Sequence, residues 1–484
     1  MAKSLRRWLY LVHRWLGIAA CLLIAMWFVS GAVMIYVPYP SLNPEERRAA
    51  LPQIAWNAVT VQPAAALAAL DARQFPAAMR LEMQQTRPVW RMEWRDKRRD
   101  SVWADTGTPI RQISRADAMR WAAAFGGAPA ASATLIERDQ WTVAQRFDPL
   151  RPLWRVELGD AAGTHVYVAG RTGEIVQHTT AFERGWNWLG AIPHWLYFTK
   201  IRTNPQFWHQ LVVWTSGPAL VVGLTGLWIG VLRLVRRGRW STPYQGWMRW
   251  HHILGLAGGL TMVTWMFSGW LSMNPFDLFA RGGDAAIAER WRAAPRHATF
   301  PPLDLPRLAS TAPAAREVRV DFLAGQPVVR VWSSGDTGAR AMLSPAGQLL
   351  QLSSLDLTMT ASAAMQPYRI RAVERLERPD LHWYGRWQAR PLPVWRVRFD
   401  DPAETWLHID LITGELLGQS TASSRSYRWL FNLLHAFDLP WLLDHRPVRD
   451  PLMWLLLALG TGMSVSGIVI GWRRLRRPAR QSTG

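Results

Sequence analysis

Four histidines occupy matching positions in an internal repeat, and their side chains can act as metal ligands. His13 corresponds to His251, 238 residues later, and His194 corresponds to His435 at an offset of 241 residues. Two neutral imidazoles on opposite sides of an iron atom fill both axial positions, which favours electron transfer over binding of oxygen or substrate at the metal. The repeat therefore predicts two equivalent iron sites, His13 with His251 and His194 with His435.

The residues around the first pair favour haem as the group that carries the iron. At 100° per residue, each of these two histidines begins a stripe rich in small residues along one face of an apolar helix. The stripes are His13, Gly17, Ala20, Ile24, Trp27 and Gly31, and His251, Gly255, Gly258, Met262, Trp265 and Gly269. The missing side-chain volume indicates a groove for something flat and bulky. Because the chain has no Cys-x-x-Cys-His motif, we expect non-covalent haem b, two per chain.

Two other histidines compete for these roles. His252 lies about 100° around the helix from His251, so both cannot face one iron, and the repeat favours His251. His209, at the start of the second apolar run, is the substitute for His194 as the outer ligand. Trp27 and Trp265 either pack between the two haems or simply fill the core.

Four apolar runs are long enough to cross a bilayer. Each has about twenty residues and almost no charge, which matches the thickness of the hydrocarbon core. They are 16–37, 211–235, 253–273 and 452–472. The N-terminal segment, the loop between the second and third runs, and the C-terminal tail are basic and contain no Asp or Glu. The positive-inside rule places these three segments in the cytoplasm, and the first run is too long for a cleaved signal peptide.

The runs divide the chain into five parts. Residues 1–38 hold the cytoplasmic N-terminus and the first span, 209–273 the second and third spans with their short loop, and 451–484 the fourth span and its basic tail. Residues 39–208 and 274–450 are then exported. Both halves run in the same direction, so we expect a pseudo-two-fold axis along the membrane normal and one four-helix bundle.

The net charge and the cysteine content argue against a nucleic-acid-binding protein and against disulfide bonds in the exported parts. Of the 56 Lys and Arg, 14 flank the spans on the cytoplasmic side. The remaining 42 basic residues compare with 35 acidic residues. The exported parts are therefore only mildly basic, which argues against nucleic-acid binding and is compatible with anionic ligands. The single cysteine, Cys21, lies in the first span, so burial alone must stabilise the exported parts.

A smaller unit recurs four times in the exported parts. Each copy has a Pro-containing strand with alternating large residues, followed by a second strand that ends at a glycine turn, which predicts a hairpin. The strands are 88–92, 152–156, 327–331 and 393–397, and the turns end at Gly107, Gly173, Gly347 and Gly414. Alanine-rich helical stretches, 64–72 and 116–125, precede the first two hairpins. Each exported part is thus expected to hold two small α+β units, with Trp90, Trp154 and Trp395 buried.

These motifs together resemble the PepSY-associated transmembrane helix family. They are a helix that opens with His-x-x-Leu-Gly and reaches Ser-Gly, the Pro-x-Trp-Arg-Val strand with its Thr-Gly turn, a later His before the second span, and a last span that closes with Gly-x-x-x-Gly-Trp-Arg-Arg. The resemblance covers nearly the whole chain. It implies an α+β membrane protein with a four-helix transmembrane bundle of two parallel-related repeats and two exported PepSY-like domains.

The resemblance also implies a location and an activity. Family members with this layout include di-haem proteins of the bacterial inner membrane proposed to reduce ferric iron bound to siderophores. The short cytoplasmic segments leave no room for a flavin or nicotinamide domain, so electrons would come from a quinol, reduced flavin or a separate reductase. Two alternatives stay open: a non-enzymatic PepSY anchor that binds or restrains a partner protein, and a transporter. The transporter is less favoured because no acidic residue lies within the four runs.

Overall fold

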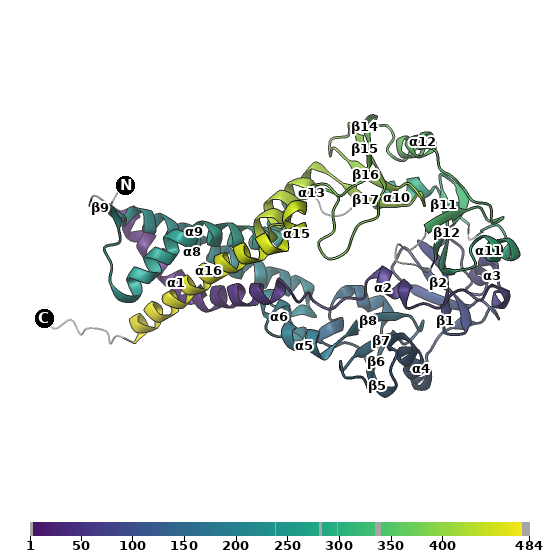
Figure 1. Ribbon diagram of the computed structural model, residues 1–484, viewed down its shortest axis with the longest axis horizontal. Helices are drawn as coiled ribbons and strands as arrows, with labels where there is room; N and C mark the ends of the chain where they lie inside the picture. Colours follow the sequence, from purple (N-terminus) through teal and green to yellow (C-terminus); the bar gives the residue numbers. More distant parts are fainter. Residues whose placement is uncertain (1–2, 238, 280–282, 298, 334–339, 477–484) are drawn as a thin grey trace.

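Four long helices pack together at one end of the molecule, and three large antiparallel sheets lie at the other end (Figure 1). The computed structural model describes residues 3–237, 239–279, 283–297, 299–333 and 340–476. Arg477 and Arg480 of the basic tail lie outside the described residues. The fold is mixed α+β, as expected, and its four apolar helices indicate a multi-pass membrane protein with soluble domains.

The four helices of the bundle match the four predicted spans, three of which run one to three residues past the end of the helix. They are α1 (Lys3–Met34), α8 (Pro205–Leu232), α9 (Gly246–Ser272) and α16 (Arg446–Leu475). Asn204 caps α8 by accepting a hydrogen bond from the amide of Phe207 at 2.9 Å, and Pro205 takes the first helical position. Large apolar side chains such as Leu22 and Leu260 face outward from the bundle, as lipid contact requires.

The order of packing in the bundle sets which helices face each other across its centre. Helix α1 packs against α8 and α16, and α9 packs against the same two helices. Helices α1 and α9, which carry His13 and His251, therefore lie diagonally opposite. The short antiparallel ribbon of β9 (Val235–Arg237) and β10 (Arg239–Ser241) connects α8 to α9.

One seven-stranded sheet joins the two exported parts, in the order β13-β12-β11-β1-β2-β3-β4. Its strands are β1 (Ala78–Gln84), β2 (Arg87–Glu93), β3 (Arg99–Trp103), β4 (Pro109–Ile110), β11 (Ala315–Leu323), β12 (Gln326–Ser333) and β13 (Arg340–Leu343). Strands β1 and β11 pair antiparallel, with Arg80 opposite Arg319. The first units of the two exported parts thus share one sheet, whereas the repeated hairpin motifs predict separate units.

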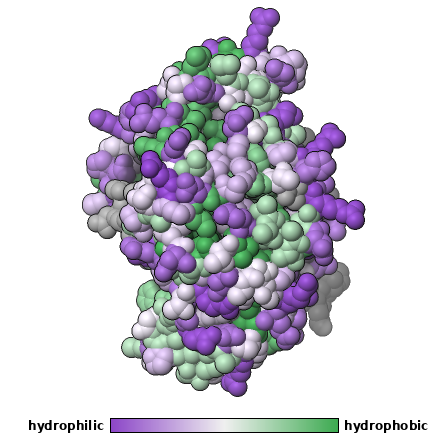
Figure 2. Space-filling view, turned by 90° about the vertical axis from the view of Figure 1, so that its right-hand side faces the viewer, coloured by the Kyte–Doolittle hydropathy of each residue, from purple (hydrophilic) through white to green (hydrophobic). Residues whose placement is uncertain are grey.

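Two four-stranded sheets lie on opposite sides of the molecule, between the bundle and the seven-stranded sheet (Figure 1). One contains β5 (Ala130–Ile136), β6 (Leu153–Leu158), β7 (His165–Ala169) and β8 (Ile175–Thr179), and the other β14 (Ile370–Leu376), β15 (Val394–Phe399), β16 (Trp406–Asp410) and β17 (Leu416–Ser420). Helix α4 (Arg115–Gly126) covers the first sheet, and α12 (Ser354–Ala364) covers the second. On the end of the molecule farthest from the bundle, hydrophilic side chains project between smaller apolar patches (Figure 2).

The predicted hairpins and turns are present. Gly107, Gly173, Gly347 and Gly414 all have positive φ, between +62° and +75°, a conformation that side chains other than glycine rarely adopt. Trp90 is fully buried, as predicted. Trp154 and Trp395, at the same place in their strands, are only half-buried, because the neighbouring strands β5 and β14 lie at sheet edges.

Shorter helices complete the fold. In the exported parts they are α2 (Pro44–Ala49), η1 (Trp56–Ala58), α3 (Pro63–Ala68), η2 (Gln140–Thr142), η3 (Gln145–Leu150), η4 (Pro275–Asp277), α10 (Ala285–Arg292) and α11 (Leu305–Thr311). Two sets connect the four-stranded sheets to the bundle: α5 (Ala181–Asn187), α6 (Ala191–His194) and α7 (Thr199–Arg202), and α13 (Ala422–Tyr427), the π-helical turn η5 (Arg428–Leu433), α14 (Leu434–Ala436) and α15 (Pro440–Asp444). The second pair of histidines lies in these connecting helices.

Ion pairs connect the two four-stranded sheets to the seven-stranded sheet. Glu174, in a Thr-Gly-Glu turn, pairs with Arg80 of β1 and with Arg99 of β3 at 3.1 Å. Its repeat mate Glu415 pairs with Arg319 of β11 at 3.4 Å. The repeated Thr-Gly-Glu sequence therefore has a packing role.

Candidate functional site

His13 and His251 meet at the centre of the bundle. Their imidazole ring centres lie 6.3 Å apart, with the ring planes inclined by 42°. His13 Nδ1 lies 3.2 Å from the carbonyl oxygen of Val222 in α8, and His251 Nδ1 lies 3.2 Å from that of Met463 in α16. A carbonyl can only accept, so each Nδ1 donates, and each Nε2 keeps its lone pair in the neutral ring.

His194 and His435 form a second pair beside the ends of α1 and α9. Their ring centres lie 6.0 Å apart. Each Nδ1 lies 3.0 Å from a serine hydroxyl, Ser30 on α1 for His194 and Ser268 on α9 for His435. Each hydroxyl donates its own proton to a carbonyl of the preceding helical turn, so it accepts from the imidazole. The Nε2 lone pairs are again left available.

The second pair is neutral at physiological pH. Burial lowers the pKa of His194 to about 4. Burial, together with the neighbouring His194 and Arg386, lowers the pKa of His435 to about 3. A neutral imidazole is the form that binds a metal.

The spacing within both pairs fits one metal atom held between two rings. An imidazole nitrogen binds a metal at about 2 Å and the ring centre lies about 1 Å beyond it, so two axial imidazoles have ring centres about 6 Å apart. No Nε2 of the four histidines has a hydrogen-bond partner among the described residues. The same part of the chain contains no group of three or more His, Cys, Asp or Glu side chains that could hold a metal ion. Two protein ligands suit a metal that brings its own equatorial ligands, as haem iron does.

Glycines shape the space around the four rings. A Cβ added to Gly226 or Gly467 would lie 2.7 Å or 3.4 Å from Cε1 of His13 or His251, and Gly31 and Gly269 have the same relation to His194 and His435. One turn after His13, a Cβ on Gly17 would meet only Val222 within 4 Å, at 3.9 Å. The helix surface beside the inner pair is therefore only loosely packed at Gly17.

The two competing histidines are engaged elsewhere. His252 contacts the hydroxyl of Thr242 through Nδ1 and the carbonyl of Gly230 through Nε2, both at 2.8 Å. His209 donates from Nε2 to the carbonyl of Met273 at 2.7 Å, at the end of α9. Neither ring is brought to a histidine pair.

Methionine, aliphatic and aromatic side chains fill the bundle between the two pairs. His13 and Ser30 are seventeen residues apart on α1, which corresponds to about 25 Å along the helix axis. Trp27 lies beside the outer pair, because its indole donates to the carbonyl of His194 at 3.0 Å. The rings of Phe28 and Trp265 are 5.7 Å apart. These side chains belong to the apolar core of the bundle and lie closer to the outer pair than to the inner one.

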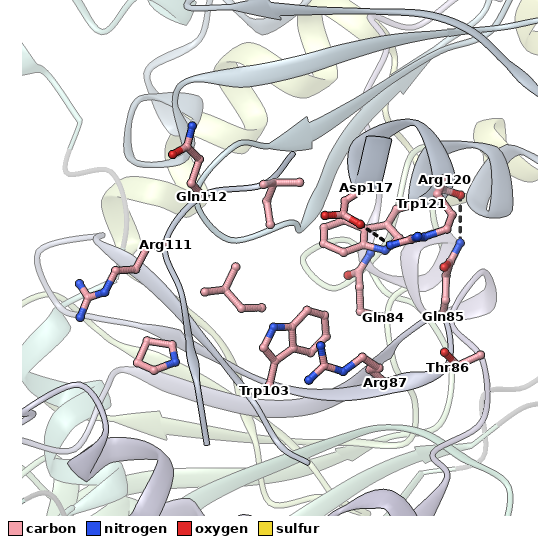
Figure 3. A pocket seen from close by; sticks show the side chains of 13 residues that line it. Gln84, Gln85, Thr86, Arg87, Trp103, Arg111, Gln112, Asp117, Arg120 and Trp121 are labelled. Carbon is pink, nitrogen blue, oxygen red and sulfur yellow. Dashed lines mark hydrogen bonds and ion pairs between the residues drawn. The ribbon is translucent and has the colours of Figure 1, made fainter. Parts of the chain in front are cut away.

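A separate cavity of about 550 Å³ lies in the exported part, between the edge of the seven-stranded sheet and helix α4 (Figure 3). Trp103 and Trp121 line it, with the guanidinium of Arg87 stacked 4.0 Å from the Trp103 ring. The cavity is lined by no histidine and belongs to neither pair. The sequence carries no signal for this cavity, because its walls come from two different units.

Comparisons with protein-family models, with curated proteins and with solved structures found no match for this chain. The likeness to the PepSY-associated transmembrane helix family therefore stays a resemblance carried by the motifs of the sequence.

Proposed function

We propose that this protein holds two b-type haems and passes electrons across the bacterial inner membrane to a ferric chelate, such as an iron siderophore, in the periplasm. The observation that supports this most strongly is the geometry of the histidine pairs. Both pairs have ring centres about 6 Å apart, and all four Nε2 atoms are free of hydrogen bonds among the described residues.

Each part of the chain has a stated task in this function. Haem bound between a pair of imidazoles supplies a one-electron carrier. Hydrogen bonds to Nδ1 fix the orientation of each ring and make its Nε2 more basic. The apolar core of the bundle excludes water between the two sites. The aromatic side chains of Trp27, Phe28 and Trp265 lie in the space that the electron must cross.

The direction of transfer follows from the topology. Basic segments flank the inner ends of the helices, so both termini and the α8–α9 connection are cytoplasmic and the three sheets are periplasmic. His13 and His251 then lie toward the cytoplasm, where a quinol, a reduced flavin or a reductase delivers electrons. His194 and His435 lie toward the periplasmic acceptor.

A transmembrane electron-transfer assay tests this function. The full chain is reconstituted into liposomes with dithionite, a reductant that does not cross the bilayer, on one side and ferric citrate on the other. We expect the unmodified protein to form ferrous iron. The rate should fall at least tenfold in the His194→Ala or His435→Ala variant, and it should be unchanged in the His252→Ala variant. Rates equal to those of protein-free liposomes would contradict electron transfer and favour a PepSY anchor.

A further inference from the structure

The two halves differ in the hydrogen bonding of buried donors near the outer pair. In the first half, the indole of Trp27 donates to the carbonyl of His194, and the amide of Asn187 donates to the carbonyl of Pro38, both at 3.0 Å. Trp208 donates to the carbonyl of Trp195 at 2.8 Å. The protein itself satisfies the donors at these three positions.

The repeat mates in the second half are Trp265, Arg428 and Arg449, and each has an unpaired buried donor. Trp265 Nε1, Arg428 Nε and Nη1, and Arg449 Nε have no hydrogen-bond partner among the described residues. Arg428 is 6% exposed and Arg449 is 4% exposed. An unpaired buried donor of a charged group is costly, so these positions indicate a missing acceptor.

Both guanidinium groups are fixed to the backbone that follows His435. Arg428 Nη2 donates to the carbonyl of Asp438 at 2.6 Å, and Arg449 Nη2 donates to the carbonyl of Ala436 at 3.0 Å. The remaining N–H groups of both side chains thereby lie beside the backbone that follows His435.

A third arginine and two carboxylates complete the cluster. Arg386, from the connection between β14 and β15, lies 3.7 Å from the Asp438 carboxylate, and Arg449 Nη1 donates to Asp450 at 3.2 Å. The three guanidinium groups exceed the two carboxylates by one positive charge. Guanidinium forks recognise carboxylates, so a ligand carboxylate is the acceptor that best fits this cluster.

We propose that Arg428 and Arg449 bind a propionate carboxylate of the haem held by His194 and His435. This inference rests on the proposed function. The cluster has no charged equivalent at the matching positions of the first half, which are Trp27, Asn187 and Trp208. One guanidinium of the first half, Arg202, is also buried with unpaired Nε and Nη1. It stacks on Tyr197 and Trp208 and serves as the comparison.

The test uses the full chain in detergent with His251→Ala, which empties the inner site. Haem and haem dimethyl ester, whose propionates are esterified, are titrated separately and followed by absorbance. We expect haem to bind roughly 10- to 100-fold more tightly than the ester, as charge-assisted hydrogen bonds imply. Arg428→Gln with Arg449→Gln should remove this preference, whereas Arg446→Gln, an exposed arginine of the same helix as Arg449, should keep it.

Two results would overturn the inference while leaving the proposed function intact. One is equal binding of haem and its ester by the chain with both arginines present, a comparison that needs no arginine variant to fold. The other is a preference that disappears with Arg202→Gln and persists in the Arg428 and Arg449 variants. Failure of the chain to bind either compound would refute the proposed function itself.

Discussion

The proposed function of this chain depends on four individual histidines. The sequence paired His13 with His251 and His194 with His435 through the repeat, and the fold brings each pair to about 6 Å between ring centres. Hydrogen bonds of Nδ1 could not be foreseen, because their acceptors lie on other helices. The role of Arg428 could not be predicted for the same reason, because its neighbours depend on the π-helical turn η5.

Single substitutions should separate the two sites. His13→Ala or His251→Ala should each leave one haem per chain, because either change removes one of the two proposed axial ligands of the inner iron. His194→Ala or His435→Ala should also leave one haem per chain, and the haem that is lost should be the outer one. The pyridine haemochrome assay on purified protein measures this stoichiometry. Retention of two haems by any of these variants would remove that histidine from the ligand set.

His252→Ala is the matched control for His251→Ala. We expect it to keep both haems, because both nitrogens of His252 are hydrogen-bonded to Thr242 and Gly230. It should lower the free energy of unfolding by about 1–3 kcal/mol, the usual cost of leaving buried partners unsatisfied. Thermal unfolding followed by circular dichroism measures the loss. A haem content that falls to one per chain would assign His252 as a ligand.

The Thr-Gly-Glu turn of the first half holds two sheets together. Burial alone would raise the pKa of the Glu174 carboxyl. The charges of Arg80 and Arg99 outweigh this effect and lower the pKa to about 2. A carboxylate with a depressed pKa stabilises the folded state fully above its ordinary value, and this stability is lost as the pH falls from about 4.5 to 2. Acid should therefore loosen the contact between the sheet of β5–β8 and the seven-stranded sheet.

Glu174→Gln should lower the free energy of unfolding by about 3–5 kcal/mol at neutral pH, since it leaves buried arginines unpaired. Glu157→Gln, in the same sheet, should cost less than about 1 kcal/mol, because that carboxylate is 40% exposed. Denaturant unfolding at pH 7 and pH 3 gives both values. If the Glu174 variant is as stable as the Glu157 variant, the turn does not dock the sheets.

Secondary structure was more predictable than the pairing of sheets. Hydropathy and strand alternation located the spans, the hairpins and the four glycine turns. The pairing of β1 with β11 was missed because the partners lie about 240 residues apart and every strand of the repeat alternates alike. Trp154 and Trp395 show the same limit, since their burial depends on which strand lies at the sheet edge.

Across the whole molecule, the arrangement depends on the orientation of the bundle. The bundle has near-repeat symmetry in its helices and differs between halves where it meets the exported sheets. A reporter enzyme fused after Arg476 should be active only if it is a cytoplasmic type, because basic residues flank that end of α16. Activity of a periplasmic reporter there would invert the proposed direction of electron transfer.

The haem content and spin state of the purified full chain test the central claim most directly. A reduced-minus-oxidised absorbance spectrum, calibrated by the pyridine haemochrome, should show two b-type haems per chain. Both should be low-spin and six-coordinate, because in the proposed sites two imidazoles would fill the axial positions of each iron. A preparation that is folded by circular dichroism and contains no haem after expression with haem supplied would contradict the account. So would haem that is high-spin and five-coordinate.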